Sequence, residues 1–229
     1  MTGGRVRPRA ADATPAAGAG GDDSAAARNQ LTIGVAVAVP EPDATMLREA
    51  RLSYGDEQAH VIPTHVTILP PTLVDADHLP LVCRHLEEVA AQTVPFDIEL
   101  LGTDSFRPVS PVVFVPLVRG ASACVALAAL VRSGPLARDL AFSYHPHVTL
   151  GHNIPDERLD EAERDSRGVH VEFLAHEIGL YLRHDDQTWE RRAAFPFLGE
   201  TGDVLSLGLL GGASSAGADD AAGTGGSAS

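Results

Sequence analysis

Two short stretches of this chain carry nearly the same pattern: PTHVTILPP at residues 63–71 and YHPHVTLGH at residues 144–152. Each places His-Val-Thr and an aliphatic residue just after a proline-containing bend. Side chains alternate across a β-strand, so the histidine and the threonine of each stretch share one face. The pattern predicts two strands that bury their aliphatic face in a core and present one imidazole and one hydroxyl on an open face.

The chain has 229 residues and 44% hydrophobic side chains, enough for one large domain or two small lobes with a real core. Residues 1–29 and 201–229 are rich in small and polar residues and lack periodic apolar positions. Such composition is typical of disordered tails. We therefore predict one folded unit over residues 30–200.

Charge and cysteine content limit the classes of function. The formal net charge is −14. All 17 of the Lys+Arg residues are arginines, so the chain has no lysine for Schiff-base chemistry or for a lysine-bearing phosphate loop. An acidic surface repels a long polyanion, so a nucleic-acid substrate should be a small piece or an end. Cys83 and Cys124 lie far apart and no apolar run is long enough to cross a bilayer, so we expect a cytoplasmic protein.

Hydrophobic periodicity predicts strands and helices whose order repeats in the two halves of the folded unit. Strands are expected at residues 31–39, 60–69, 96–106, 112–118 and 142–154, followed by a terminal hairpin made of residues 171–184 and 189–197. Helices are expected at residues 43–55, with Asp43 as the cap, and at residues 75–93, 123–131 and 155–168. This order indicates an α+β fold with two similar lobes.

If the two lobes face each other, His65 with Thr67 and His147 with Thr149 line one cleft. Displacement at phosphorus needs a base for the nucleophile and an acid for the leaving group, and histidine serves either role near neutral pH. Hydroxyl groups can donate hydrogen bonds to the phosphate oxygens as charge builds there. The pattern therefore predicts phosphodiester chemistry that needs no metal ion.

At these residues the sequence resembles the 2H phosphoesterase superfamily, which includes 2′-5′ RNA ligases and RNA 2′,3′-cyclic phosphodiesterases. The resemblance covers roughly residues 30–198 and includes the segments GTDSFRPVSPVVFVPL and IGLYLRHDDQTWERRAAFPF. It implies a duplicated α+β fold of mainly antiparallel sheets, with helices outside, a pseudo-two-fold axis and a central V-shaped cleft. It also implies that His65 is the acid, His147 the base, and Thr67 and Thr149 the phosphate ligands, with the two histidines exchanging roles in the ligation direction.

Five further residues are candidates for substrate binding: His145, Phe106, Arg107, Tyr144 and Arg183. Arg107 could clamp a phosphate while Phe106 stacks on a base, but the same residues could equally be a solvated loop and a core ring. His145 could join His65 and His147 as a metal ligand, but no nearby carboxylate or cysteine completes the set. We therefore predict no metal and no cofactor, with His145 either at the mouth of the cleft or supporting the residues that contact the substrate.

The leading hypothesis is hydrolysis of a 2′,3′-cyclic phosphate on a nucleotide or a short RNA end by a monomer. The first alternative is 2′-5′ joining of RNA ends, which uses the same residues in reverse. The others are a nucleotide-binding module without turnover and a metallohydrolase. We do not expect the protein to bind a membrane or a long nucleic acid.

Overall fold

The computed structural model describes residues 29–139 and 143–200, so the two predicted tails lie outside it apart from Asn29. Its strands are β1 (Gln30–Ala38), β2 (His65–Asp75), β3 (Phe96–Leu101), β4 (Asp104–Ser105), β5 (Val112–Arg119), β6 (His147–His152), β7 (His170–Ala175), β8 (Glu177–Arg183) and β9 (Trp189–Pro196). Its α-helices are α2 (Asp43–Ser53), α3 (Leu79–Gln92), α4 (Ala121–Val131) and α5 (Asp156–Asp165). Short 3-10 turns are η2 (Glu57–His60), η3 (Ala76–His78) and η4 (Gly134–Leu136).

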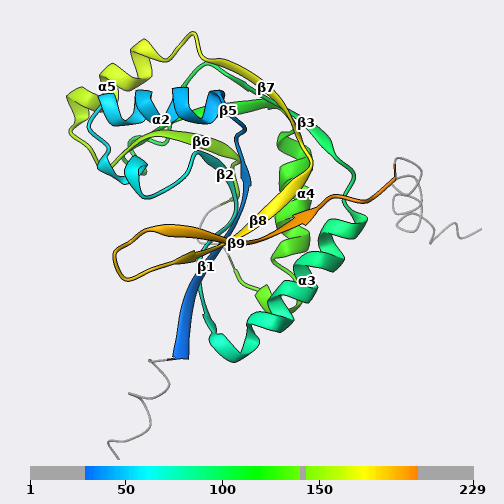
Figure 1. Ribbon diagram of the computed structural model, residues 1–229. Helices are drawn as coiled ribbons and strands as arrows, with labels where there is room; N and C mark the ends of the chain where they lie inside the picture. Colours follow the sequence, from blue (N-terminus) through cyan, green and yellow to red (C-terminus); the bar gives the residue numbers. More distant parts are fainter. Residues whose placement is uncertain (1–28, 140–142, 201–229) are drawn as a thin grey trace, which may run out of the picture.

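The strands form two antiparallel sheets (Figure 1). The first has the order β2-β1-β8-β9, and the second has the order β4-β5-β3-β7 with β6 paired to β5. Each strand with the His-Val-Thr sequence therefore lies at the end of its sheet, β2 beside β1 and β6 beside β5. The predicted α+β fold of two similar, mainly antiparallel halves is confirmed.

The helices that join the paired strands pack against the opposite half of the molecule. Helix α2 connects β1 to β2 but contacts β6, and α4 connects β5 to β6 but contacts β2. Helix α5 also packs on β5 and β6, whereas α3 lies beside α4 and reaches β9 (Figure 1). Side chains on α2 are thereby carried to the strand that holds the second His-Val-Thr sequence.

The aliphatic residues of the two motifs lie in the core. Val66 and Ile68 of β2, like Val148 and Leu150 of β6, are at most 1% exposed, and all four belong to one continuous apolar cluster. Burial of side chains of this size stabilises the fold by about 1.5–3 kcal/mol each. The predicted alternation along both strands is confirmed, and this burial fixes the opposite face of each strand toward the open side.

Several strand boundaries differ from the prediction: β2 begins at His65 and not at residue 60, which lies in η2, and the predicted strand 96–106 is divided into β3 and β4. Strand β2 does not end at residue 69 but continues through Pro70 and Pro71 to Asp75, paired only with β1. Proline lacks the N–H that a second neighbour would need, so a strand at the edge of a sheet accommodates it. Strand β6 begins only at His147, and residues 143–146 are irregular, while the predicted start at Phe142 lies outside the described residues.

The expected terminal hairpin is present as β8 and β9, but the segment 171–184 is not one strand of it. The chain leaves the second sheet after Ala175 and enters the first at Glu177, so β7 and β8 belong to different sheets. Each sheet thus takes strands from both halves of the sequence. This exchange holds the two sheets together around the space between them.

Helix α2 starts at Asp43 as expected, although the capping is different. No side-chain cap bond is made by the residue before it, and the Glu41 carboxylate instead accepts the backbone N–H of Thr45 at 3.1 Å. A carboxylate near the first turn is also favoured by the helix dipole. Within residues 29–139 and 143–200, none of the helices combines the length and apolar character that crossing a membrane requires.

Candidate active site

The two histidines are held by the same backbone arrangement. Nδ1 of His65 lies 2.6 Å from the carbonyl oxygen of Pro63, and Nδ1 of His147 lies 2.7 Å from that of His145. A carbonyl oxygen only accepts hydrogen bonds, so Nδ1 carries the proton in both rings. The bend before each strand delivers this carbonyl, and Nε2 is left as the atom available for proton transfer.

The surroundings of the two Nε2 atoms differ. Nε2 of His65 lies 3.0 Å from Oγ1 of Thr67, so in the neutral ring the threonine hydroxyl donates to it. Nε2 of His147 has no hydrogen-bond partner among the described residues. Because every buried side-chain nitrogen or oxygen in those residues has a partner, this Nε2 atom must reach solvent.

Burial makes both imidazoles harder to protonate. Desolvation lowers the pKa of His65 below its ordinary value, despite the opposing effect of the Pro63 carbonyl. Desolvation also lowers the pKa of His147 to about 4, and the nearby imidazoles of His145, His65 and His152 lower it further. Both rings are therefore neutral at pH 7 until an anion approaches them.

A cavity of about 540 Å³ lies between the two sheets. Its wall includes His65 and Thr67 from β2 and Thr149 and His152 from β6. The size is ordinary for a small-molecule site, which spans ~300–1,000 Å³. The two predicted units thus meet at one cavity, through three of their four side chains.

The fourth side chain, His147, lies beside this cavity and not in its wall. Its ring centroid is 5.0 Å from those of Phe106 and Phe114, with the Phe106 ring nearly perpendicular to it. Thr149, two residues along the same strand face, is in the wall. The aromatic pair therefore supports the imidazole from one side, and the open Nε2 is its remaining polar atom.

Arg51 also reaches the cavity, and sequence reasoning missed it. It comes from the last turn of α2 and is 7% exposed, and its Nε donates to Oδ2 of Asp56 at 2.8 Å. It lines both the main cavity and a small hollow beside it, together with His65 and Thr149.

The Arg51 guanidinium is fixed through Nε alone. Its Nη1 and Nη2 atoms have no partner among the described residues, so they too must be reached by solvent. Asp56 is 2% exposed and also accepts the backbone N–H groups of His152 and Gln58. This buried carboxylate orients an arginine fork whose free edge can bind an anion in two places at once.

Tyr144 joins the two motif strands. Its hydroxyl donates to the carbonyl oxygen of Thr67 at 2.6 Å, and burial raises the pKa of this hydroxyl. The guanidinium of Arg132 lies 5.9 Å from the centre of the ring. Tyr144 thus links β2 to the segment before β6. Tyr144 itself does not line the cavity.

The remaining predicted substrate residues are distributed differently. Arg107 donates to Asp160 and Glu163 of α5, at 2.7 Å each, so its guanidinium is already paired. Phe106 packs on Phe114 at 4.2 Å and contacts the rings of His147 and, at 5.5 Å, of the exposed His145. Arg183 alone of this group lines the main cavity.

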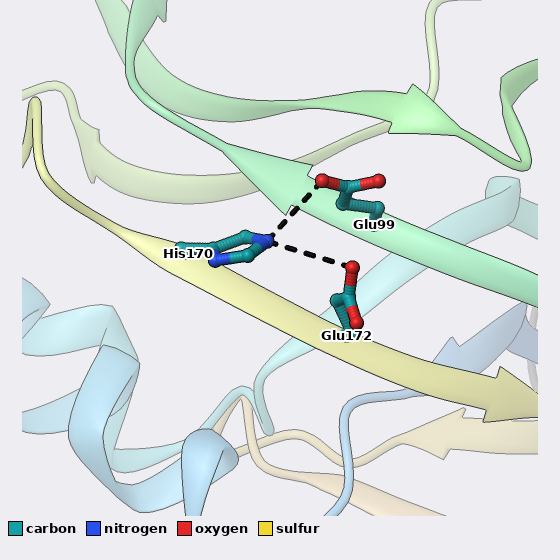
Figure 2. A group of neighbouring side chains, drawn as sticks. All are labelled: Glu99, His170 and Glu172. Atoms are coloured by element: carbon teal, nitrogen blue, oxygen red, sulfur yellow. Dashed lines mark hydrogen bonds and ion pairs between the residues drawn. The ribbon is translucent and has the colours of Figure 1, made fainter.

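Among the described residues, the one group of three potential metal ligands lies outside the cavity. It consists of Glu99 on β3 and His170 and Glu172 on β7, and Figure 2 shows the His170 ring between the two carboxylates. Nε2 of His170 is 3.2 Å from Glu99, and Arg119 donates to both carboxylates at 2.8 Å. Arg119 already pairs with both carboxylates, so this group is a surface ion-pair network.

Comparison with known proteins gives a family. A family model described as the 2′-5′ RNA ligase superfamily matches residues 39–187. A protein of Halalkalibacterium halodurans named as a phosphoesterase is 30% identical over 161 residues, covering 69% of this chain and 93% of its own length. A protein of Geobacillus kaustophilus with the same kind of name is 23% identical over 161 residues, covering 69% and 92%.

Solved structures agree on the fold. E. coli LigT complexed with 3′-AMP has a TM-score of 0.53 at 16% identity, with 73% of this chain and 98% of LigT covered. LigT complexed with ATP has a TM-score of 0.52 at 18% identity, with 75% and 99% covered. The family match and the relative in H. halodurans show that this chain belongs to the 2′-5′ RNA ligase superfamily, the 2H phosphoesterases, and is a phosphoesterase of that superfamily.

Proposed function

We propose that this phosphoesterase hydrolyses the 2′,3′-cyclic phosphate of a nucleotide or a short RNA end, with His65 and His147 as its acid–base pair and without a metal ion. The observation that carries the proposal is the meeting of His65, Thr67 and Thr149 in one cavity wall, with His147 next to it. The matching carbonyl contacts leave Nε2 of each ring for the reaction.

The proposed reaction is a single in-line displacement at phosphorus. Nε2 of His147 accepts a proton from water while the water oxygen forms its bond to phosphorus. The bond from phosphorus to one ribose oxygen breaks, and Nε2–H of His65 donates its proton to that oxygen. Thr67, Thr149 and the free edge of Arg51 donate hydrogen bonds to the phosphate oxygens, and the product is a phosphomonoester beside a free hydroxyl.

Substrate charge resolves the difficulty that both rings are neutral at pH 7. A cyclic phosphate carries one negative charge, and an anion close to an imidazole raises its pKa. Binding of the substrate therefore favours protonation of His65, the ring that needs a proton. The acid–base order is the one that the family resemblance implies.

A small nucleotide fits the site better than a long RNA. The net charge of −14 disfavours a long polyanion, and the cavity of about 540 Å³ is sized for a small molecule. LigT, which shares the fold, has been crystallised as complexes named for 3′-AMP, ATP and NADP+. We also expect a monomer to be sufficient, because the proposed acid–base pair and the proposed phosphate-binding side chains all belong to the same chain.

Turnover of the four nucleoside 2′,3′-cyclic phosphates and of ADP-ribose 1″,2″-cyclic phosphate tests the proposal. We expect His65→Asn and His147→Asn each to lower kcat by roughly 10²- to 10⁴-fold with the fold retained, and a chelator to leave the rate unchanged. His176→Asn, at an exposed histidine outside the cavity wall, is the control. Wild-type turnover by either of the first two variants would falsify the proposed mechanism.

The family match also supports ligation as a second candidate. The same residues run in reverse would join a 2′,3′-cyclic phosphate to a 5′-hydroxyl through a 2′-5′ linkage. Incubation with tRNA half-molecules tests it, and a lack of joined product under conditions where cyclic nucleotides are hydrolysed would leave hydrolysis as the function.

A further inference from the structure

One part of the cavity wall is formed by the one tryptophan of the chain. Trp189 begins β9 and lines the cavity, where the Cζ3–Cη2 edge of its six-membered ring lies against Gly34 of β1. A Cβ atom at position 34 would be 3.0 Å from Cζ3 and 3.4 Å from Cη2 of this ring. The missing side chain of Gly34 therefore provides the space that the indole occupies.

Trp189 is not a core side chain. It is only partly buried and belongs neither to the apolar core cluster nor to the partly buried residues packed against it. Its backbone is nonetheless anchored, because its N–H donates to the carbonyl oxygen of Val61 at 3.1 Å. The turn before it is ordered by Asp186, whose carboxylate accepts both the N–H and the hydroxyl of Thr188.

A second aromatic ring lies next to this platform. Tyr181 pairs with Gly34 across β1 and β8, and it also lines the cavity. Its ring lies over Gly179, where an added Cβ would be 2.7 Å from Cε2. Two glycines on neighbouring strands thus let two aromatic side chains pack closely against the sheet in the wall of the cavity.

The separation between this platform and the phosphate-binding side chains suits a nucleoside. Ala36 pairs with Thr67, and Gly34 is two residues from Ala36 along β1, which is ~7 Å in a strand. That distance, with the spacing between strands, corresponds to one ribose between a phosphate and its base. Each base has a π-face, and stacking on an aromatic side chain is the usual way that proteins hold it.

We propose that Trp189, packed against Gly34, forms a subsite for the nucleobase, so that the substrate class is a nucleoside phosphate whose base stacks on the indole. The inference rests on the proposed function for the place of the phosphate group. It adds that the base is recognised at Trp189, about two residues along β1 from the position opposite Thr67. Purines, with the larger ring surface, bind better than pyrimidines.

The single tryptophan makes the subsite directly measurable by fluorescence. Titration of the full chain with adenosine 3′-monophosphate should quench the emission of Trp189, whereas inorganic phosphate and ribose 5-phosphate should leave it unchanged. Titration of the His147→Asn variant should give the same quenching, because the measurement requires no turnover. No quenching by the nucleotide, or equal quenching by phosphate alone, overturns the inference.

Variants at position 189 test the contribution of stacking, with affinities measured by calorimetry. We expect Trp189→Leu to weaken binding of adenosine 3′-monophosphate roughly 10- to 100-fold while leaving the affinity for inorganic phosphate unchanged. Trp189→Phe, which keeps an aromatic ring, should recover part of the lost affinity. This recovery would show that the loss in Trp189→Leu comes from stacking and not from misfolding. An enzyme that hydrolyses cyclic phosphates but shows no loss in Trp189→Leu would refute this subsite and leave the proposed function standing.

Discussion

In the first motif, Nε2 of His65 is hydrogen-bonded to Thr67 of its own strand at 3.0 Å, whereas in the second motif Nε2 of His147 has no partner among the described residues. His65 lines the cavity, and His147 lies beside it against Phe106 and Phe114. The two four-residue motifs differ only in the branching of their last side chain, Ile68 or Leu150. Their different environments come from other elements.

This difference suits the two roles of the proposed mechanism. An open Nε2 with a lone pair, as in His147, can accept a proton from water without first breaking another contact. An Nε2 that is paired with a hydroxyl, as in His65, is held in place until it is protonated. The two similar strands thus hold two imidazoles in the same tautomer. The packing around each ring determines whether it is better placed to accept or to donate a proton.

The largest effect outside the histidines is expected at Arg51, which approaches both motifs from α2. Arg51→Met should lower kcat/KM by roughly 10²- to 10³-fold, because it removes the charged donors aimed at the phosphate. Arg51→Lys should recover only a part, since an ammonium group cannot replace a planar fork. Inhibition by inorganic phosphate measures the same site without chemistry.

Arg84→Met is the matched control for Arg51→Met, because Arg84 is an exposed arginine on α3 that does not line the cavity. Urea unfolding of each variant separates lost binding from lost stability, since Asp56 is left buried without its arginine. Unchanged kcat/KM in a folded Arg51→Met protein would mean that Arg51 serves only to neutralise Asp56.

Acid sensitivity gives the next effect, and it concerns the second motif. The pKa of His147 is about 4 in the folded chain, whereas an unfolded histidine titrates near ~6.5. As pH falls between these values, only the unfolded state takes up the proton, so stability is lost. At pH 4.5 the loss relative to pH 7 amounts to about 2–3 kcal/mol from this one residue.

His147→Gln should therefore lose less stability on acidification than the wild type, although we expect it to be inactive. Urea unfolding at pH 7 and pH 4.5 measures the difference, with His176→Gln at the exposed histidine as the control. If wild type and His147→Gln lose the same free energy of unfolding between the two pH values, the imidazole is not held neutral by burial.

Much of this arrangement was predictable from local patterns. Alternation in HVTI and HVTL was sufficient to predict that His65 shares a face with Thr67 and His147 with Thr149, because two-residue periodicity is a local property of strands. The α+β fold and the order of the elements followed from the same kind of pattern. What was missed depends on contacts between distant segments.

Arg51 and Trp189 illustrate why those contacts were not visible. A lone arginine near the end of a helix usually faces solvent, and only the crossing of α2 onto β6 brings this one to the cavity. Trp189 looked like one residue of an ordinary hairpin, because nothing local links it to Gly34. Arg107 was left as either a phosphate clamp or a solvated loop residue, because the sequence does not show that Asp160 and Glu163 pair with it in the fold.

The prediction of a single strand over residues 171–184 was wrong for a related reason. Its residues have strand-forming character throughout, and hydrophobic patterning does not record which partner a strand has. The chain changes sheets around His176, between β7 and β8. Only the positions of β3 and β1, the neighbours of these two strands, distinguish one long strand from two short ones.

Removal of the Thr67 or the Thr149 hydroxyl should have a smaller effect on activity, and it compares the two motifs directly. Thr67→Val and Thr149→Val should each lower kcat/KM by roughly 10- to 100-fold, as expected when one hydrogen bond to a charged group is lost. Thr67→Val should have the larger effect, because it also removes the partner of Nε2 in His65. A larger loss in Thr149→Val would mean that the contact between Thr67 and His65 is not maintained during turnover.

The smallest expected effect is a displacement of the pH–rate profile on substrate binding. The kcat/KM profile reports the free enzyme, in which burial lowers the pKa of both histidines, so its optimum should lie on the acidic side of ~6.5. The kcat profile reports the complex, where the negative phosphate favours protonated imidazoles and raises both values. The kcat optimum should therefore lie at higher pH, by about one unit for an anion in hydrogen-bond contact. Coincident profiles would show that the phosphate does not approach the two rings, and the difference between the two motifs would then have no role in catalysis.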